Sequence, residues 1–331
     1  MSKIKQVFLI TIIVCIGKSS FAQFTTTGGN ITQSTTGNVG IGILTPTAPL
    51  SLLEVKNGSV LFDGYIGTTP ISGVGTRMMW VPSKSAFRAG SVSGTQWNDA
   101  SIGLNSFACG SSTTASGQYS VSMGAGVIAS GNSAFSVGFN TNASGAQSNA
   151  FNYYSIASGS YASAFGQRTT AQAYNSFVIG RFNVNPGTYS TTTWVATEPL
   201  FVLGNGSSAA TANNALTVLK NGNVLINKAT QVNSTYKLDV NGKIRASEIV
   251  VNTTGADFVF EKNYELMPLD VLEQKINADK HLPEIASAEE MQTNGVGLSE
   301  LNIKLLQKTE ELTLYIIELN KRIERLENKN K

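Results

Sequence analysis

The chain contains few of the side chains that most catalytic and metal sites need. Its 331 residues include one histidine, His281, and two cysteines, Cys15 and Cys109. A histidine-based triad or a site with several histidine ligands therefore cannot form within one chain. From Ala100 to Val178 the only charged residue is Arg168, so this part also lacks the paired carboxylates of acid/base catalysis. We expect no catalytic, cofactor or metal site, and no enzyme activity.

Residues 1–22 have the pattern of a secretory signal peptide. Lys3 and Lys5 precede an apolar stretch from Val7 to Ile16, and Ser20-Phe21-Ala22 provides a small-residue cleavage site. The apolar stretch is too short to span a bilayer. We therefore expect a secreted or cell-surface protein without stable membrane insertion.

Charge gives no support for a nucleic-acid partner. The chain has 24 basic and 21 acidic side chains, and the predicted signal peptide contains three of the basic ones, at positions 3, 5 and 18. Its removal would leave 21 of each sign. A balanced chain of this kind offers no general attraction to nucleic acid or to an anionic membrane.

A fourteen-residue repeat runs from Phe107 to Gly180. The tripeptide Ala-Ser-Gly recurs at this spacing from Ala115 onward, and in the same register a glycine follows an apolar residue, except at Phe151-Asn152. A fixed short period indicates one structural unit stacked on copies of itself. The apolar residues of this register, which we predict to form the repeat core, are Cys109, Met123, Val137, Phe151, Phe165 and Ile179.

Each repeat predicts two short strands and two turns, which is one coil of a β-roll. Phe135 and Val137 alternate with polar residues, as in a half-buried strand. Ala-Ser-Gly predicts a turn in which the glycine has a positive φ, and successive coils would stack about 4.8 Å apart. Each coil has only two or three sizeable apolar side chains, too few to stabilise a single thin solenoid. We therefore expect several chains to associate.

The repeat between about Asp99 and Asn183 resembles the head repeat of trimeric autotransporter adhesins, because apolar-x-apolar-Gly is followed by Ala-Ser-Gly. The resemblance implies three left-handed β-rolls packed about a threefold axis, and it implies adhesion. The chain differs from that family in ending with a predicted coiled coil where the family has a membrane-anchor β-barrel.

The segments that flank the repeat are similar to the β-strand shafts of phage-tail-fibre-like proteins. Asn57-Gly58, Asn221-Gly222 and Asn241-Gly242 predict hairpin turns within them. No pattern assigns a fold to residues 62–98. The predicted order is signal peptide 1–22, N-terminal β shaft 23–98, β-roll head 99–183, second β shaft 184–255, short-helix module 256–297 and coiled coil 298–331.

Residues 256–297 predict two short helices. Pro268 suits the first turn of one helix, and Leu269, Leu272 and Ile276 have the spacing of one apolar face. A capping box from Ser287 to Glu290 predicts the start of the other helix, which Gly295 can close.

Residues 298–331 predict a coiled coil of at least four heptads. Its d positions are Leu298, Leu305, Leu312, Leu319 and Leu326, and its a positions are Asn302, Thr309, Ile316 and Ile323. Ile at a with Leu at d ordinarily favours two strands. The segment from Arg322 to Glu327, however, resembles a trimerisation motif in which the arginine reaches the glutamate of a neighbouring helix. We predict a homotrimer, with a dimer as the alternative.

The stretch from Asp257 to Tyr315 resembles the terminal module of secreted tail-fibre-like proteins from Bacteroidetes-type bacteria and is similar to intramolecular chaperone domains that trimerise tail spikes. Self-cleaving members of that group carry a Ser-Asp pair, and Gly255-Ala256-Asp257 contains no serine.

Taken together, the sequence predicts a mainly β, trimeric fibre that presents its head to a host surface, glycan or matrix. The alternatives are a self-processing tail-spike-type protein and a purely architectural envelope or phage-tail-like component.

Overall fold

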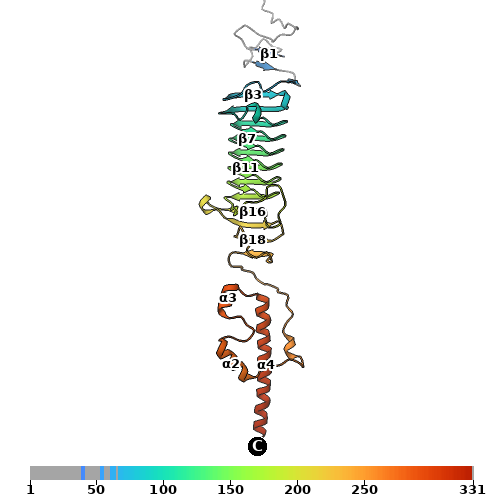
Figure 1. Ribbon diagram of the computed structural model, residues 1–331, viewed down its shortest axis with the longest axis vertical. Helices are drawn as coiled ribbons and strands as arrows, with labels where there is room; N and C mark the ends of the chain where they lie inside the picture. The colour runs from blue at the N-terminus through green and yellow to red at the C-terminus, as the bar shows by residue number, and fades with distance from the viewer. Residues whose placement is uncertain (1–38, 42–52, 56–59, 65, 330–331) are drawn as a thin grey trace, which may run out of the picture. The chain divides into compact units, whose positions relative to one another are not determined.

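The computed structural model describes residues 39–41, 53–55, 60–64 and 66–329 (Figure 1). The predicted signal peptide and the predicted turn at Asn57-Gly58 lie outside the described residues. The chain forms two compact units, one ending at Asn241 and the other beginning at Gly242.

The first unit is a β-solenoid whose fourteen-residue coils each contribute one long and one short strand (Figure 1). The long strands are β5 (Phe107–Ser111), β7 (Val121–Ala125), β9 (Phe135–Phe139), β11 (Asn149–Tyr153), β13 (Ser163–Gln167) and β15 (Phe177–Arg181). The short strands are β6 (Thr114–Ala115), β8 (Ile128–Ala129), β10 (Asn142–Ala143), β12 (Ile156–Ala157) and β14 (Thr170–Ala171). From β5 to β13 and from β6 to β12, each strand pairs in parallel with the equivalent strand fourteen residues later, and β15 pairs in parallel with β16. The predicted coil of two strands is confirmed.

The long strands belong to a sheet of 12 strands that continues past the repeat at both ends, whereas the short strands form a separate five-stranded sheet. Before the repeat, β3 (Gly75–Val81) pairs antiparallel with β4 (Ala86–Val92), and β4 pairs in parallel with β5. After it come β16 (Pro199–Asn205), β17 (Asn214–Leu219), β18 (Val224–Ile226) and β19 (Leu238–Val240). Residues 62–98, to which no sequence pattern assigns a fold, therefore include the hairpin that begins this sheet.

The remaining elements of the first unit are short. A separate parallel pair joins β1 (Val39–Ile41) to β2 (Leu53–Val55), and single 3₁₀ turns are η1 (Pro82–Lys84), η2 (Asp99–Ser101) and η3 (Ala209–Thr211). Asn221-Gly222 connects the antiparallel strands β17 and β18 as predicted. The hairpin predicted at Asn241-Gly242 is wrong, because β19 pairs in parallel with β18 and no described strand follows it.

Small side chains fill the interior of each coil, and the predicted repeat core points the other way. The short strands contribute Ala115, Ala129, Ala143, Ala157 and Ala171, all fully buried. The long strands contribute Ala108, Ser122, Ser136, Ala150, Ala164 and Val178, also buried. The predicted core residues Cys109, Met123, Val137, Phe151, Phe165 and Ile179 are instead half-exposed or exposed. The alternation predicts the correct strands but the wrong face, because the interior of a fourteen-residue coil holds small side chains, none larger than the valine at Val127 or Val178.

The glycine of Ala-Ser-Gly is required for close backbone approach, not for the positive φ that we predicted. Gly117, Gly131, Gly145 and Gly159 are absent from the glycines with left-handed φ among the described residues. A Cβ atom added to Gly131 would lie only 1.9 Å from the carbonyl oxygen of Gly145 in the next coil. The pattern ends at Ala173, which follows β14, the last strand of the five-stranded sheet.

Large or charged side chains are buried on both sides of the repeat. At the first end Trp97 is fully buried and donates from Nε1 to the Thr113 carbonyl at 2.9 Å. Arg88 is also fully buried and donates to the carbonyl oxygens of Ser106 and Ala115, each at 3.0 Å. Burial lowers the pKa of its guanidinium to about 10. At the other end Lys220 pairs with Glu198 at 3.1 Å. Trp97 and Arg88 therefore lie before the first coil of the repeat, and Glu198 and Lys220 lie after the last one.

The second unit is helical. It contains η4 (Asp257–Phe260), α2 (Leu269–Asp279), α3 (Ala288–Asn294) and α4 (Leu298–Lys329). The capping box at Ser287 and the closure of α3 at Gly295, with φ of 70°, are confirmed. Pro268 precedes α2 as its N-cap, with an extended ψ of 140°, rather than lying in the first turn. The helix predicted from Leu298 is confirmed as α4.

Substituting Gly131→Ala should destabilise the solenoid, because its new methyl group would overlap the Gly145 carbonyl. We expect a loss of about 2–3 kcal/mol in the free energy of unfolding, as for other overpacked sites. Thermal unfolding followed by circular dichroism measures this loss. The matched control is Gly187→Ala, since a Cβ there would meet no atom within 4 Å. Equal effects of the two substitutions would contradict the close-approach explanation.

Candidate association surfaces

The outer face of the 12-stranded sheet carries two mainly apolar rows of side chains that run from coil to coil, the first of them interrupted by Asn149 and Ser163. In the first row, partners in the strand register are Phe87, Phe107, Val121, Phe135, Asn149, Ser163, Phe177 and Phe201. The second row contains Cys109, Met123, Val137, Phe151, Phe165, Ile179 and Leu203. We call these two rows the apolar face. It contains every residue that the sequence analysis assigned to the repeat core.

Aromatic contacts along the apolar face join successive coils. Phe151 stacks on Phe165 with ring centroids 4.5 Å apart and planes 5° apart. Phe135 meets Phe151 edge-on at 5.3 Å, and Phe177 lies 5.4 Å from Phe165. Such pairs add about 0.5–1.5 kcal/mol each beyond the burial of their area. The contacts therefore hold the rings in a regular surface that is still partly open to solvent.

The opposite outer face is less apolar. The outward positions of the five-stranded sheet alternate between polar and apolar residues, in the order Thr114, Ile128, Asn142, Ile156 and Thr170. Isolated apolar side chains of this kind are normal on protein surfaces, whereas a continuous patch marks an interaction site. The apolar face is accordingly the stronger candidate for contact with another molecule.

Helix α4 carries a second exposed apolar surface, which we call the heptad seam. It consists of residues that the sequence analysis assigned to oligomerisation: Leu298, Leu305, Leu312, Ile316, Leu319, Ile323 and Leu326. Their exposed fractions lie between 47% for Leu319 and 58% for Ile316. The two charged residues of that assignment, Arg322 and Glu327, are exposed as well. No contact within the described chain covers this seam fully.

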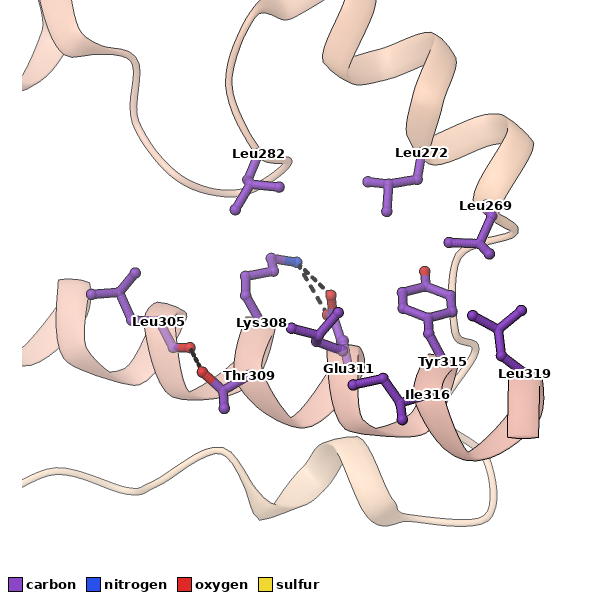
Figure 2. Close-up of a pocket in the computed structure, with 11 residues that line it drawn as sticks. Leu269, Leu272, Leu282, Leu305, Lys308, Thr309, Glu311, Tyr315, Ile316 and Leu319 are labelled. Carbon is purple, nitrogen blue, oxygen red and sulfur yellow. Dashed lines mark hydrogen bonds and ion pairs between the residues drawn. The ribbon is translucent and has the colours of Figure 1, made fainter. Parts of the chain in front are cut away.

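An apolar groove with a volume of about 420 Å³ lies beside the heptad seam. Figure 2 shows Leu269 and Leu272 of α2, together with Leu282, facing the seam across the groove. The spacing of leucines predicts the apolar face of α2 but not the position of Leu282. The position of Leu282 depends on Lys280, which ends α2 in the left-handed conformation with a φ of 62° and so changes the direction of the chain.

A polar network holds the segment that follows α2, around Glu284, against α4. The Gln307 side chain donates to Glu284 at 2.8 Å and to Glu311 at 2.9 Å, and the Lys308 ammonium pairs with both carboxylates. The hydrogen bond from Lys308 lowers the pKa of Glu284. Burial opposes charge on Lys308, yet its hydrogen bonds to the two glutamates outweigh burial and raise its pKa. Glu284 is close in sequence to Leu282, so the network holds one wall of the groove.

The structure places His281 half-exposed beside the Leu282 carbonyl, 3.0 Å from Nδ1. Within residues 60–64 and 66–329 and the two short strands before them, no three His, Cys, Asp or Glu side chains gather as metal ligands. None of the helices described has a stretch long and apolar enough to cross a bilayer.

Comparison of the chain with protein-family models, curated proteins and solved structures finds no match.

Proposed function

We propose that this chain is one subunit of a homotrimeric structural fibre, secreted or held at the cell surface, whose solenoid head serves in adhesion. The observation that supports this best is the apolar face. Its phenylalanine, methionine and isoleucine side chains stand outside the coils, while alanine, serine, threonine and valine fill the interior. A surface of this kind is expected to be covered by other molecules.

Further copies of the same chain are suitable partners for the apolar face. The two apolar rows follow the coil spacing, so a second copy presents the same spacing of apolar rows. The head also has almost no charge that would oppose close contact, since Arg168 is the only charged residue between Ala100 and Val178. Burial of partly exposed phenylalanine, valine and isoleucine side chains contributes about 25 cal/mol per Å².

The heptad seam supports association of the same copies. Its exposed leucines and isoleucines have the spacing of a coiled-coil core. Leu306, at an e position, is 44% exposed and widens the apolar stripe beyond that of a two-stranded coil. Together with the pair Arg322 and Glu327, this favours three chains. Joining the helices raises the effective concentration of the heads and so promotes their association.

The groove beside the seam fits this assembly. Leu269, Leu272 and Leu282 face the a and d positions of their own helix across an open space. In the proposed trimer, apolar side chains from α4 of a neighbouring copy fill the groove. The segment of each chain that carries Leu269, Leu272 and Leu282 then contacts α4 of the neighbouring chain.

Replacing Ile316→Asp should dissociate the trimer, because three carboxylates would meet at the helical axis without partners. Light scattering should give the mass of three chains for the unaltered protein and of one chain for the variant. Ile317→Asp is a matched control, since Ile317 is the next residue, is similarly exposed at 45%, and lies off the seam. A single-chain mass for the unaltered protein would refute the proposed trimer.

Replacing Ile179→Asp should lower the thermal stability of the head, because the charge would be buried between copies at the apolar face. Ile156→Asp is the control on the five-stranded sheet, where Ile156 is 39% exposed and no partner is proposed. Circular dichroism of the β signal should show a lower unfolding midpoint for the first variant only. Equal midpoints would contradict the use of this face.

Adhesion requires a separate test. The intact trimer should bind layers of host cells or extracellular matrix more tightly than the single-chain Ile316→Asp variant, by about a hundredfold, because three linked heads bind with avidity. Surface plasmon resonance on coated matrix measures the difference. A stable trimer that binds none of these layers would favour the purely architectural alternative.

A further inference from the structure

Three successive coils place bulky side chains at the same corner of the solenoid. Tyr154, Arg168 and Phe182 are fourteen residues apart and follow the long strands β11, β13 and β15. The Arg168 guanidinium lies 4.6 Å from the centre of the Tyr154 ring and 5.9 Å from that of Phe182. We call these three residues the corner strip. It presents alternating aromatic and cationic groups.

Further aromatic and cationic side chains adjoin the corner strip. Phe139 stacks on Tyr153 at 5.5 Å, and Tyr153 meets Tyr154 at 4.7 Å. Phe139 and Tyr153 remain 44% and 42% exposed. At the other end the Arg181 guanidinium lies 5.2 Å from the Phe182 ring. The result is an exposed platform of aromatic rings with two guanidinium groups.

The fold does not need these side chains. In the three preceding coils the same corner holds Ser112, Gly126 and Asn140, which are small or readily adopt the left-handed conformation. All six corner residues have left-handed φ, from 42° at Phe182 to 65° at Gly126. Bulky residues are disfavoured there, and strain that folding does not require is a frequent mark of a functional site.

Phe139 and Tyr153 also occupy a strand position at which the fold accepts side chains of different size and polarity. Their register partners in neighbouring coils include Ser111, Ala125 and Gln167. This third row is therefore polar or small at both ends, unlike the two rows of the apolar face. It lies between that face and the corner strip, because its residues follow the second row by two positions and precede the corner residues by one, so the corner strip lies outside the apolar face.

The charge of the platform has no partner within the described chain. Arg168 and Arg181 take part in none of the ion pairs found among the described residues. A guanidinium presents parallel N–H donors that match a carboxylate or sulfate group. Two such groups beside open ring faces are suited to an anionic ligand that also has a flat apolar surface.

We propose that the corner strip and its adjoining side chains bind an acidic polysaccharide, whose sugar rings carry carboxylate or sulfate groups. The C–H face of a sugar ring packs on the aromatic rings, and its acidic group accepts hydrogen bonds from Arg168 or Arg181. This inference rests on the proposed adhesive function and names its ligand class. A trimer offers three such sites to one polymer.

Single-stranded nucleic acid also has flat rings and negative charge, but the platform fits it less well. Binders of that class follow the phosphate backbone with a continuous basic groove. Here only two cations stand beside the rings, and Arg168 is the only charge across Ala100 to Val178. An acidic polysaccharide requires fewer cations, because many of its contacts are made by the sugar face.

The test measures binding of the full-length trimer to polygalacturonate, dextran sulfate, uncharged dextran and oligothymidylate by biolayer interferometry. We expect binding to at least one of the two acidic polysaccharides and none to uncharged dextran; a comparison of the two separates carboxylate from sulfate. Arg168→Asn should weaken binding about tenfold or more, as expected for the loss of a charge-assisted contact. Tyr154→Asn should weaken it as well, and both variants should fold, because Asn140 occupies this corner naturally.

Tyr119→Asn is the matched control. Tyr119 is 57% exposed and also has a left-handed φ, of 58°, but it lies outside the platform. Its substitution should leave polysaccharide binding unchanged. Equal binding by unaltered protein and the Arg168→Asn variant, no binding to either acidic polysaccharide, or tighter binding of oligothymidylate would each overturn the inference. A trimer that adheres to cells but ignores both acidic polysaccharides refutes this inference alone, whereas a single-chain protein refutes the proposed function.

Discussion

The structure of the head depends on how closely the backbone of one coil approaches the backbone of the next. At Gly131 and at Gly138 a Cβ atom would come within about 2 Å of a carbonyl oxygen in the following coil. Glycine permits this approach because it has no Cβ atom, so it recurs at these positions in nearly every coil. The strict fourteen-residue period is the consequence in the sequence. Asn152 is the one exception at its position, and its φ of 81° is positive but smaller than the 121° to 131° of Gly110, Gly124, Gly138 and Gly166.

Close approach also decides which side chains face outward. The space inside each coil admits Ala143 or Ser136 but not a phenylalanine, so Phe151 and Phe165 must stand on the outer face. The interior alone then buries little apolar area for the backbone that it orders. The same constraint that makes the coils uniform therefore leaves the apolar face exposed and in need of a partner.

Much of this fold is predictable from the sequence, and the failures have identifiable causes. Period and alternation predict the strands of the coils, and the leucine heptads predict α4 from Leu298. Alternation alone cannot tell which face is the interior, which is why Met123 and its equivalents were assigned to the core. The hairpin before the repeat and the position of Leu282 depend on contacts between distant residues, such as Lys308 with Glu284. The corner strip was missed because it becomes continuous only when residues fourteen apart are stacked.

The contacts on either side of the repeat do not depend on how many coils lie between them. Trp97 and Arg88 before the repeat, and Glu198 and Lys220 after it, make contacts that occur once per chain. The coils between them have equivalent backbone contacts. Gain or loss of whole coils would therefore change the reach of the head in steps of one strand spacing, about 4.8 Å, while the contacts on both sides of the repeat stay intact. Such a chain can evolve its length without redesigning its fold.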